Sequence, residues 1–80
     1  MRLFFRLPNG LTMENPHDID PRESVNYLKE YAGDLLETKY DMSKISYYIT
    51  LNGCILTDQL IETTCKSYDT IHIHIKHIKT

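Results

Sequence analysis

Residues 70–76 have the sequence Thr-Ile-His-Ile-His-Ile-Lys and decide the fold of this 80-residue chain. From position 71 on, each isoleucine is followed by a histidine or a lysine. Because successive side chains of a strand point to opposite faces, this strict alternation predicts a half-buried β-strand. The isoleucines of that strand then face the core, and His72, His74 and Lys76 face outward.

Residues 45–51 repeat the pattern. Their odd-numbered side chains are large and mostly apolar, and they alternate with Ser46, Tyr48 and Thr50, which face outward. Asn52-Gly53 is a turn signal, and residues 54–56 suit a short strand after it. We expect residues 60–67 to form a short helical turn and a loop.

Residues 1–15 predict a β-hairpin. Leu3 and Phe5 face the core in its first strand, and Gly10 accepts the positive φ that the turn over residues 7–10 requires. Leu11 and Met13 resume the alternation after the turn. The outward residues of the first strand are Arg2, Phe4 and Arg6.

A helix is predicted from Asp20 to about Thr38. Asp20 suits the capping position, Pro21 the first helical position, and Glu23 follows three residues after the cap. Apolar residues then recur at helical spacing and form one stripe: Val25, Leu28, Ala32, Leu35 and Leu36. Gly33 could end the helix, but the stripe stays in phase beyond it, which favours a continuous helix.

The predicted order is therefore hairpin, helix, strand, short strand and final strand. A helix with one apolar stripe must cover the apolar face of a sheet. We expect a single α+β domain over residues 1–80, with a mixed four- to five-stranded sheet packed on one main helix.

Short runs at both ends of the chain carry a family resemblance. Residues 1–6 and Gly10 match a first strand and its hairpin glycine, and residues 69–73 (Asp-Thr-Ile-His-Ile) match a last strand. Between them, Leu51-Asn52-Gly53 is followed in step by Leu56, Leu60 and Cys65. Over essentially its whole length the sequence resembles ubiquitin and its relatives. The resemblance implies the ubiquitin-like β-grasp fold, with the first, last and third strands side by side at the sheet centre.

The departures from the family bear on function. Modifiers of the family end in a diglycine, whereas this chain has no glycine after Gly53. The resemblance thus implies that the sequence, as it stands, is neither conjugated nor a sulfur carrier. Thr50 and His74 replace the central aliphatic residues of the surface by which ubiquitin binds its receptors, and only His72 matches that surface.

The resemblance and these departures predict a non-covalent protein-interaction domain, an adaptor or docking module. Because Met1 starts directly at the first strand, we expect it to be the N-terminal module of a longer protein. The alternative is a covalent ubiquitin-like modifier whose diglycine tail is processed or missing from this sequence.

The outward residues of the three central strands define the outer sheet face. Its predicted partner-binding residues are Arg2, Phe4, Arg6, Tyr48, Thr50, His72, His74 and Lys76. Ser46 is a further outward residue of this face. This face is basic and holds two aromatic residues, whereas the helix side of the chain is acidic. We expect it to dock an acidic protein segment, with Phe4 and Tyr48 as anchors.

Other partners are disfavoured by composition. The formal net charge is −2, and only three fixed positive charges line the outer sheet face, so a nucleic-acid-binding module is a third hypothesis behind the other two. No apolar run approaches the roughly 20 residues of a membrane span, and no signal peptide is visible, so no membrane partner is expected. The two cysteines are interpreted as free thiols, which favours the cytoplasm or the nucleus.

No catalytic, cofactor or metal site and no small-molecule substrate is predicted. His72 and His74 could join Cys54 and Cys65 in a zinc site, but the spacing matches no standard zinc pattern. Cys65 aligns with a buried apolar position of the family, and Cys54 has no specifically placed histidine as its base. The chain is therefore expected not to be an enzyme.

Overall fold

The computed structural model describes residues 1–78. The elements, in chain order, are β1 (Arg2–Arg6), β2 (His17–Asp18), α1 (Val25–Glu37), β3 (Ile45–Leu51), β4 (Cys54–Ile55), α2 (Ile61–Thr64) and β5 (Thr70–Ile78). Within this described range, neither helix is long and apolar enough to cross a membrane.

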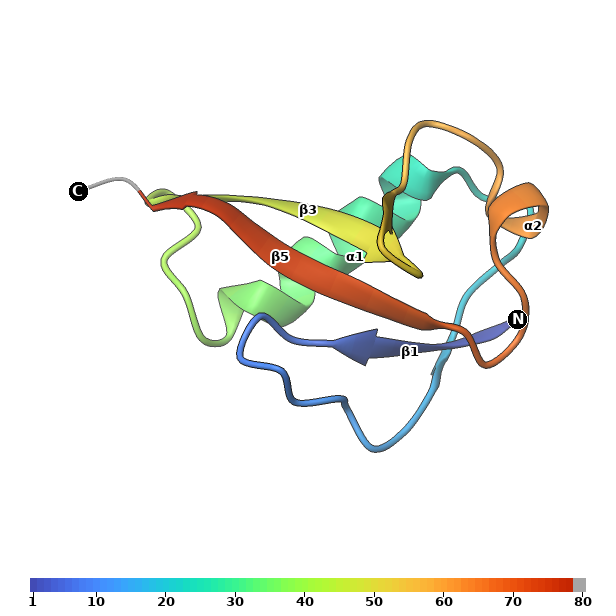
Figure 1. Ribbon diagram of the computed structural model, residues 1–80, viewed down its shortest axis with the longest axis horizontal. Helices are drawn as coiled ribbons and strands as arrows, with labels where there is room; N and C mark the ends of the chain where they lie inside the picture. Colours follow the sequence, from blue (N-terminus) through green and yellow to red (C-terminus); the bar gives the residue numbers. More distant parts are fainter. Residues whose placement is uncertain (79–80) are drawn as a thin grey trace.

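The strands form one mixed sheet in the order β2-β1-β5-β3-β4. β5 runs parallel to β1 and antiparallel to β3, so the isoleucine-rich strand lies at the centre. A β-bulge interrupts the β3–β5 register between Ser46 and Tyr47. α1 crosses one face of the sheet, and Figure 1 views the opposite face. The predicted α+β class, with a mixed sheet packed on one main helix, is confirmed and is consistent with a β-grasp fold.

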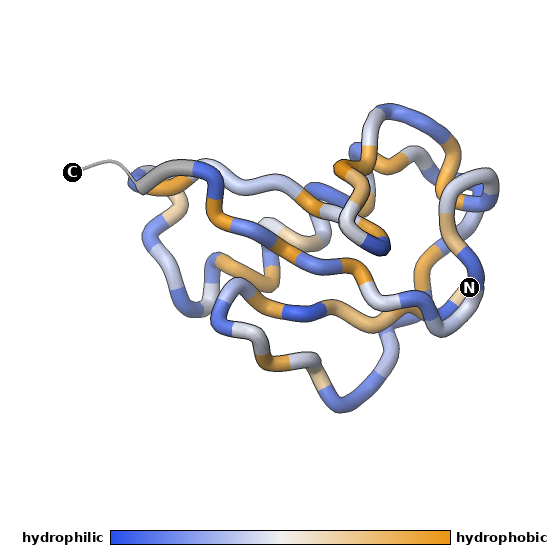
Figure 2. Tube along the Cα trace, in the orientation of Figure 1, coloured by the Kyte–Doolittle hydropathy of each residue, from blue (hydrophilic) through white to orange (hydrophobic). Residues whose placement is uncertain are grey.

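The core lies between the sheet and α1. The fully buried residues of the three central strands and the helix are Leu3, Phe5, Ile49, Ile71 and Ile73, with Val25, Leu28, Ala32 and Leu36. Figure 2 shows hydrophobic and hydrophilic residues alternating along β5. Because the apolar set faces the helix, the polar set of each strand is left on the outer sheet face.

The predicted start of the helix is wrong. Ser24, not Asp20, is the capping residue of α1. The Asp20 carboxylate instead accepts hydrogen bonds from the backbone N–H of Arg22 at 2.9 Å and from its guanidinium, and these bonds lower the pKa of Asp20. The predicted end is confirmed, since Thr38 is the C-cap.

The segment that follows the hairpin turn is longer, and its pairing with β1 is less continuous, than the alternation predicts. After the turn, the chain pairs with β1 through an isolated Arg6–Thr12 bridge, then leaves it and pairs again at β2, beyond the predicted end at Asn15. Pro16 precedes β2 and has no N–H to donate to a ladder. Leu11 is 62% exposed, so it does not join the core-facing set.

The Tyr47 ring explains why a glycine interrupts the helical stripe. The Tyr47 hydroxyl donates a 2.8 Å hydrogen bond to the Lys29 carbonyl and passes directly over Gly33. A Cβ atom at position 33 would overlap this hydroxyl and would lie 3.1 Å from the ring carbon Cζ. Because Gly33 has no side chain, the Tyr47 side chain fits between β3 and α1.

We expect Gly33→Ala to destabilise the domain by about 1–2 kcal/mol, because displacing the Tyr47 ring outweighs the gain of about 1 kcal/mol in helix propensity. Urea denaturation followed by circular dichroism measures the change. In a Tyr47→Phe background the penalty should shrink by at least about 1 kcal/mol, since the overlapping hydroxyl is gone. An equal penalty in both backgrounds would show that the Tyr47 hydroxyl is not the obstacle.

Candidate functional site on the outer sheet face

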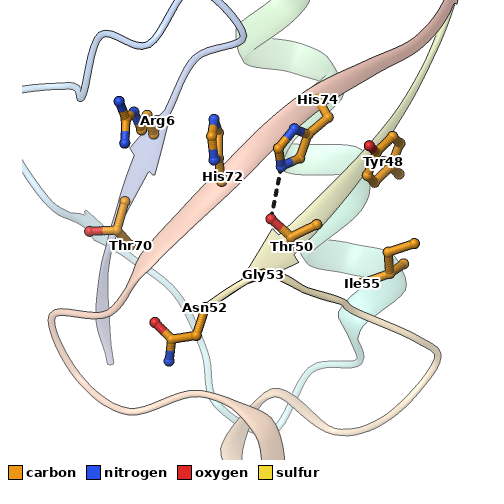
Figure 3. Close-up of a pocket in the computed structure, with 9 residues that line it drawn as sticks. All are labelled: Arg6, Tyr48, Thr50, Asn52, Gly53, Ile55, Thr70, His72 and His74. Atoms are coloured by element: carbon orange, nitrogen blue, oxygen red, sulfur yellow. Dashed lines mark hydrogen bonds between the residues drawn. The ribbon is translucent and has the colours of Figure 1, made fainter.

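Cross-strand register decides which outward side chains become neighbours. Arg6 of β1 pairs with His72 of β5, and His72 is opposite Thr50 of β3. Two residues further along β5, on the same face of the sheet, His74 is opposite Tyr48 of β3. Figure 3 shows these side chains side by side across the three strands.

Three rings stand next to one another in this row. The Tyr48 and His74 rings are stacked, with centroids 4.9 Å apart and planes 12° from parallel. The His74 and His72 centroids are 4.0 Å apart, with the rings tilted by 39°. The rings come from opposed and alternate positions of β3 and β5, so the sheet itself fixes their spacing.

Thr50 lies under the rings rather than at the surface. It faces outward, yet it is only 5% exposed. Its Oγ1 and the Nε2 atom of His74 are 2.9 Å apart and share a hydrogen bond, drawn as the dashed line in Figure 3. Because this bond satisfies a buried hydroxyl, it stabilises one orientation of the His74 ring.

Arg6 provides the fixed positive charge of the row. Its Nε atom donates a 2.9 Å hydrogen bond to the Gly10 carbonyl, which ties the side chain to the hairpin turn while the residue stays exposed. The pKa of His72 lies below its ordinary value because the ring is partly desolvated and because His74 and Arg6 add positive charge. His72 therefore favours its neutral form in the free protein.

A groove of about 440 Å³ runs over these side chains, and we name it the sheet-face groove. It is lined by Arg6, Tyr48, Thr50, Asn52, Gly53, Ile55, Thr70, His72 and His74. None of these described lining residues carries a carboxylate. The groove thus combines positive charge at Arg6 with apolar surface at Tyr48 and at Ile55, which is 63% exposed.

The alternation of β3 and β5 did not reveal part of this groove. Asn52 and Gly53 both have positive φ, in agreement with the turn signal, and their turn forms one wall. Ile55 of β4 and Thr70 of β5 also line it. In the sequence, the signals for this wall are the Asn52-Gly53 turn and the isoleucine that follows it at position 55. They do not show which face of the sheet the turn borders.

The structure gathers some of the predicted binding residues and leaves others apart. Within the groove lie Arg6, Tyr48, Thr50, His72 and His74; Arg2, Phe4 and Lys76 are not among its lining residues. Phe4 pairs with Thr70 and lies beside Tyr68, with ring centroids 6.3 Å apart. The two predicted anchors, Phe4 and Tyr48, therefore belong to separate parts of the outer sheet face.

Tyr68 is a surface aromatic residue that sequence reasoning missed. It has a φ of +68°, in the left-handed region that bulky residues rarely adopt, and its side chain is 61% exposed. Its backbone N–H donates to the Arg2 carbonyl, which anchors the loop before β5 to β1. Tyr68 and Phe4 together form a small aromatic patch next to the groove.

The two cysteine side chains differ in exposure. Cys54 is exposed, whereas Cys65 is buried as expected, and its burial, with a smaller effect of Asp69, raises the pKa of its thiol. Both cysteines are free. Across residues 1–78, no three histidine, cysteine or acidic side chains gather in a way that could hold a metal ion.

No protein-family model matches this chain, and no curated protein has significant sequence similarity to it.

Proposed function

We propose that this chain is a divergent ubiquitin-like domain that docks an acidic segment of a partner protein in the sheet-face groove, without covalent conjugation. The groove lies on the face of the sheet that α1 does not cover (Figure 1), so an extended segment can reach it. Free Cys54 and Cys65 suit a reducing compartment, the cytoplasm or the nucleus.

The charge pattern of the groove supports this function most directly. Arg6 and two imidazoles lie together with no carboxylate among the described lining residues, although the chain as a whole has a formal charge of −2. The fixed positive charge of Arg6, with imidazoles beside it that can accept protons and no carboxylate in the described lining, favours an anionic partner through electrostatic complementarity.

The apolar side of the groove favours a protein segment over a nucleic acid. Tyr48 and the exposed Ile55 offer apolar surface next to the charges, and tyrosine and arginine are enriched among interface hot spots. The Tyr48 ring is already stacked on His74, so it is less available as a platform for a base. An acidic segment with one aromatic or aliphatic residue fits both sides of the groove.

The Thr50–His74 hydrogen bond superficially resembles a nucleophile with its base. Thr50 is nearly inaccessible, and the groove lining contains no carboxylate to orient the imidazole. A nucleophilic hydroxyl must reach its substrate, and its base normally has such an orienting partner. The pair therefore supports ring positioning in a binding domain rather than catalysis.

A peptide titration followed by amide chemical shifts tests this function. The probe is a blocked pentapeptide with four glutamates around one phenylalanine, and we expect a dissociation constant on the order of 1 mM, about −4 kcal/mol. The amides of Arg6, Thr50 and His72 should shift, whereas those of α1 should not. The matched control is the same peptide with glutamine at every glutamate position, which should bind at least several-fold more weakly.

Two results would argue against the proposal. Shifts confined to α1, or shifts equal for the glutamate and glutamine peptides, would mean that the groove does not read acidic side chains. Tighter binding of an eight-nucleotide oligothymidylate than of the acidic peptide, with a steep salt dependence, would favour the nucleic-acid hypothesis instead.

A further inference from the structure

His72 lies in the middle of the row of side chains that runs from Arg6 through His72 and His74 to Tyr48. On the β1 side it faces Arg6, along β5 it faces His74, and on the β3 side it faces the uncharged Thr50. The titratable or charged groups around its ring are therefore Arg6 and His74, with Tyr48 behind His74. No described residue of the groove offers a carboxylate to neutralise a proton on the ring.

This setting makes the proton affinity of His72 depend on whether the groove is occupied. In the free protein, partial burial and the neighbouring positive charges oppose a proton on His72. A bound carboxylate would reverse the electrostatic part of this penalty, because an opposite charge within about 4–6 Å favours the charged form of a group. By thermodynamic reciprocity, whatever raises proton affinity on binding must also raise binding affinity on protonation.

We propose that docking of an acidic segment is coupled to the uptake of a proton by His72, so that the sheet-face groove binds its partner more tightly as the pH falls. This inference rests on the proposed function, because it requires an acidic segment in the groove. The proton source is the solvent, and the only bond that forms is the N–H bond on the imidazole.

The sign follows from the two states of His72. Its pKa in the free protein is below the ordinary histidine value. The proposed coupling requires its pKa in the complex to be higher than in the free protein. The complex therefore binds more protons between these two pKa values, and the affinity rises as the pH falls through that window. Each unit of difference between the two pKa values changes the affinity by up to about tenfold.

The experiment measures the affinity of the same acidic pentapeptide between about pH 5.5 and pH 8, a range in which glutamate stays ionised. We expect binding about fivefold to tenfold tighter at the acidic end. In parallel, the ring proton resonances of His72 should show a higher pKa with saturating peptide than without it. The His72 resonances report on the wild-type protein, so this part of the test needs no variant.

Two variants of one residue provide matched controls. His72→Gln, which is always neutral, should bind weakly with little pH dependence. His72→Lys keeps a positive charge, so it should bind at pH 8 about as tightly as the wild type does at pH 5.5.

The outcomes separate the two proposals. Binding that is specific for glutamate but independent of pH would overturn proton coupling, and a pH dependence that persists in His72→Gln would overturn its assignment to His72. Either result would leave the docking function intact. Absence of glutamate-specific binding at every pH would overturn the docking function, and the coupling with it.

Discussion

Replacing Phe5 with alanine should lower the free energy of unfolding by about 3–5 kcal/mol, because this side chain is completely buried at the centre of an aromatic cluster. Its ring centroid lies 5.4 Å from that of Tyr31, in a stacked arrangement, and 5.4 Å from that of His17, edge to face. The His17 Nδ1 atom and the Tyr31 hydroxyl, 2.6 Å apart, share a hydrogen bond across the cluster. A cavity at this point would loosen β1, β2 and α1 together.

Phe4 is the matched control for this change. It is the same residue type, one position earlier in β1, but it lies half-buried on the outer sheet face beside Tyr68. We expect Phe4→Ala to cost about 1 kcal/mol, measured by urea denaturation alongside Phe5→Ala. Since a domain of this size has only about 5–10 kcal/mol of stability, Phe5→Leu is the fallback if Phe5→Ala does not fold. A larger loss for Phe4→Ala than for Phe5→Ala would mean that the two faces of β1 are assigned the wrong way round.

Reversing the charge of Arg6 should have the largest effect on binding. Arg6→Glu replaces the fixed positive charge of the sheet-face groove with a negative one beside His72. We expect the acidic pentapeptide to bind at least about tenfold more weakly, which corresponds to about 1.4 kcal/mol. The difference should decrease as salt is added, because Arg6 is exposed and its field is screened.

Arg2 gives the corresponding control on the same strand and face. It lies four residues from Arg6, or about 13 Å along an extended strand, which exceeds the screening length of about 8 Å at physiological salt. Arg2→Glu should therefore change the affinity less than about threefold. Equal losses in both variants would point to attraction by the whole outer sheet face rather than by the groove.

The parts of the fold that depend on local alternation could be predicted from the sequence. β3 covers the predicted residues 45–51, and the Asn52-Gly53 turn follows it. The start of α1 could not be predicted in this way, because distant residues determine it. The backbone N–H of Val25 donates to the Gln59 carbonyl, and that of Ile61 donates to the Glu23 carbonyl. These bonds hold Ser24 in an extended conformation, and residues 21–22 form a separate turn closed by the Glu23 N–H to the Asp20 carbonyl, so the local capping signal at Asp20 does not start a helix.

The candidate site, like the fold, could be predicted from the sequence in part. Alternation correctly placed Tyr48, His72 and His74 on one face, but it contains no information on the offset between strands. The register puts Tyr48 opposite His74 and leaves Phe4 opposite Thr70, which separates the two aromatic residues that the sequence suggested as joint anchors. It also buries Thr50, an outward residue, beneath a neighbouring imidazole.

We expect the β-bulge between Ser46 and Tyr47 to oppose association between copies of this protein in concentrated solution. Among the described residues, β1 pairs with residues 70–72 of β5, and β4 pairs with Thr50 and Leu51 of β3. The other ends of β3 and β5 therefore extend beyond these outer strands. Isoleucine-rich strand ends without a neighbour are templates on which another chain can add a strand and begin a fibril. The bulge breaks the even spacing of the ladder, and the exposed Lys76 adds charge, two devices that oppose stacking. Because Ser46 pairs with His77 and Tyr47 with Ile75, Lys76 is the extra residue of this bulge, and we expect it to lower the tendency of β3 and β5 to pair with another chain.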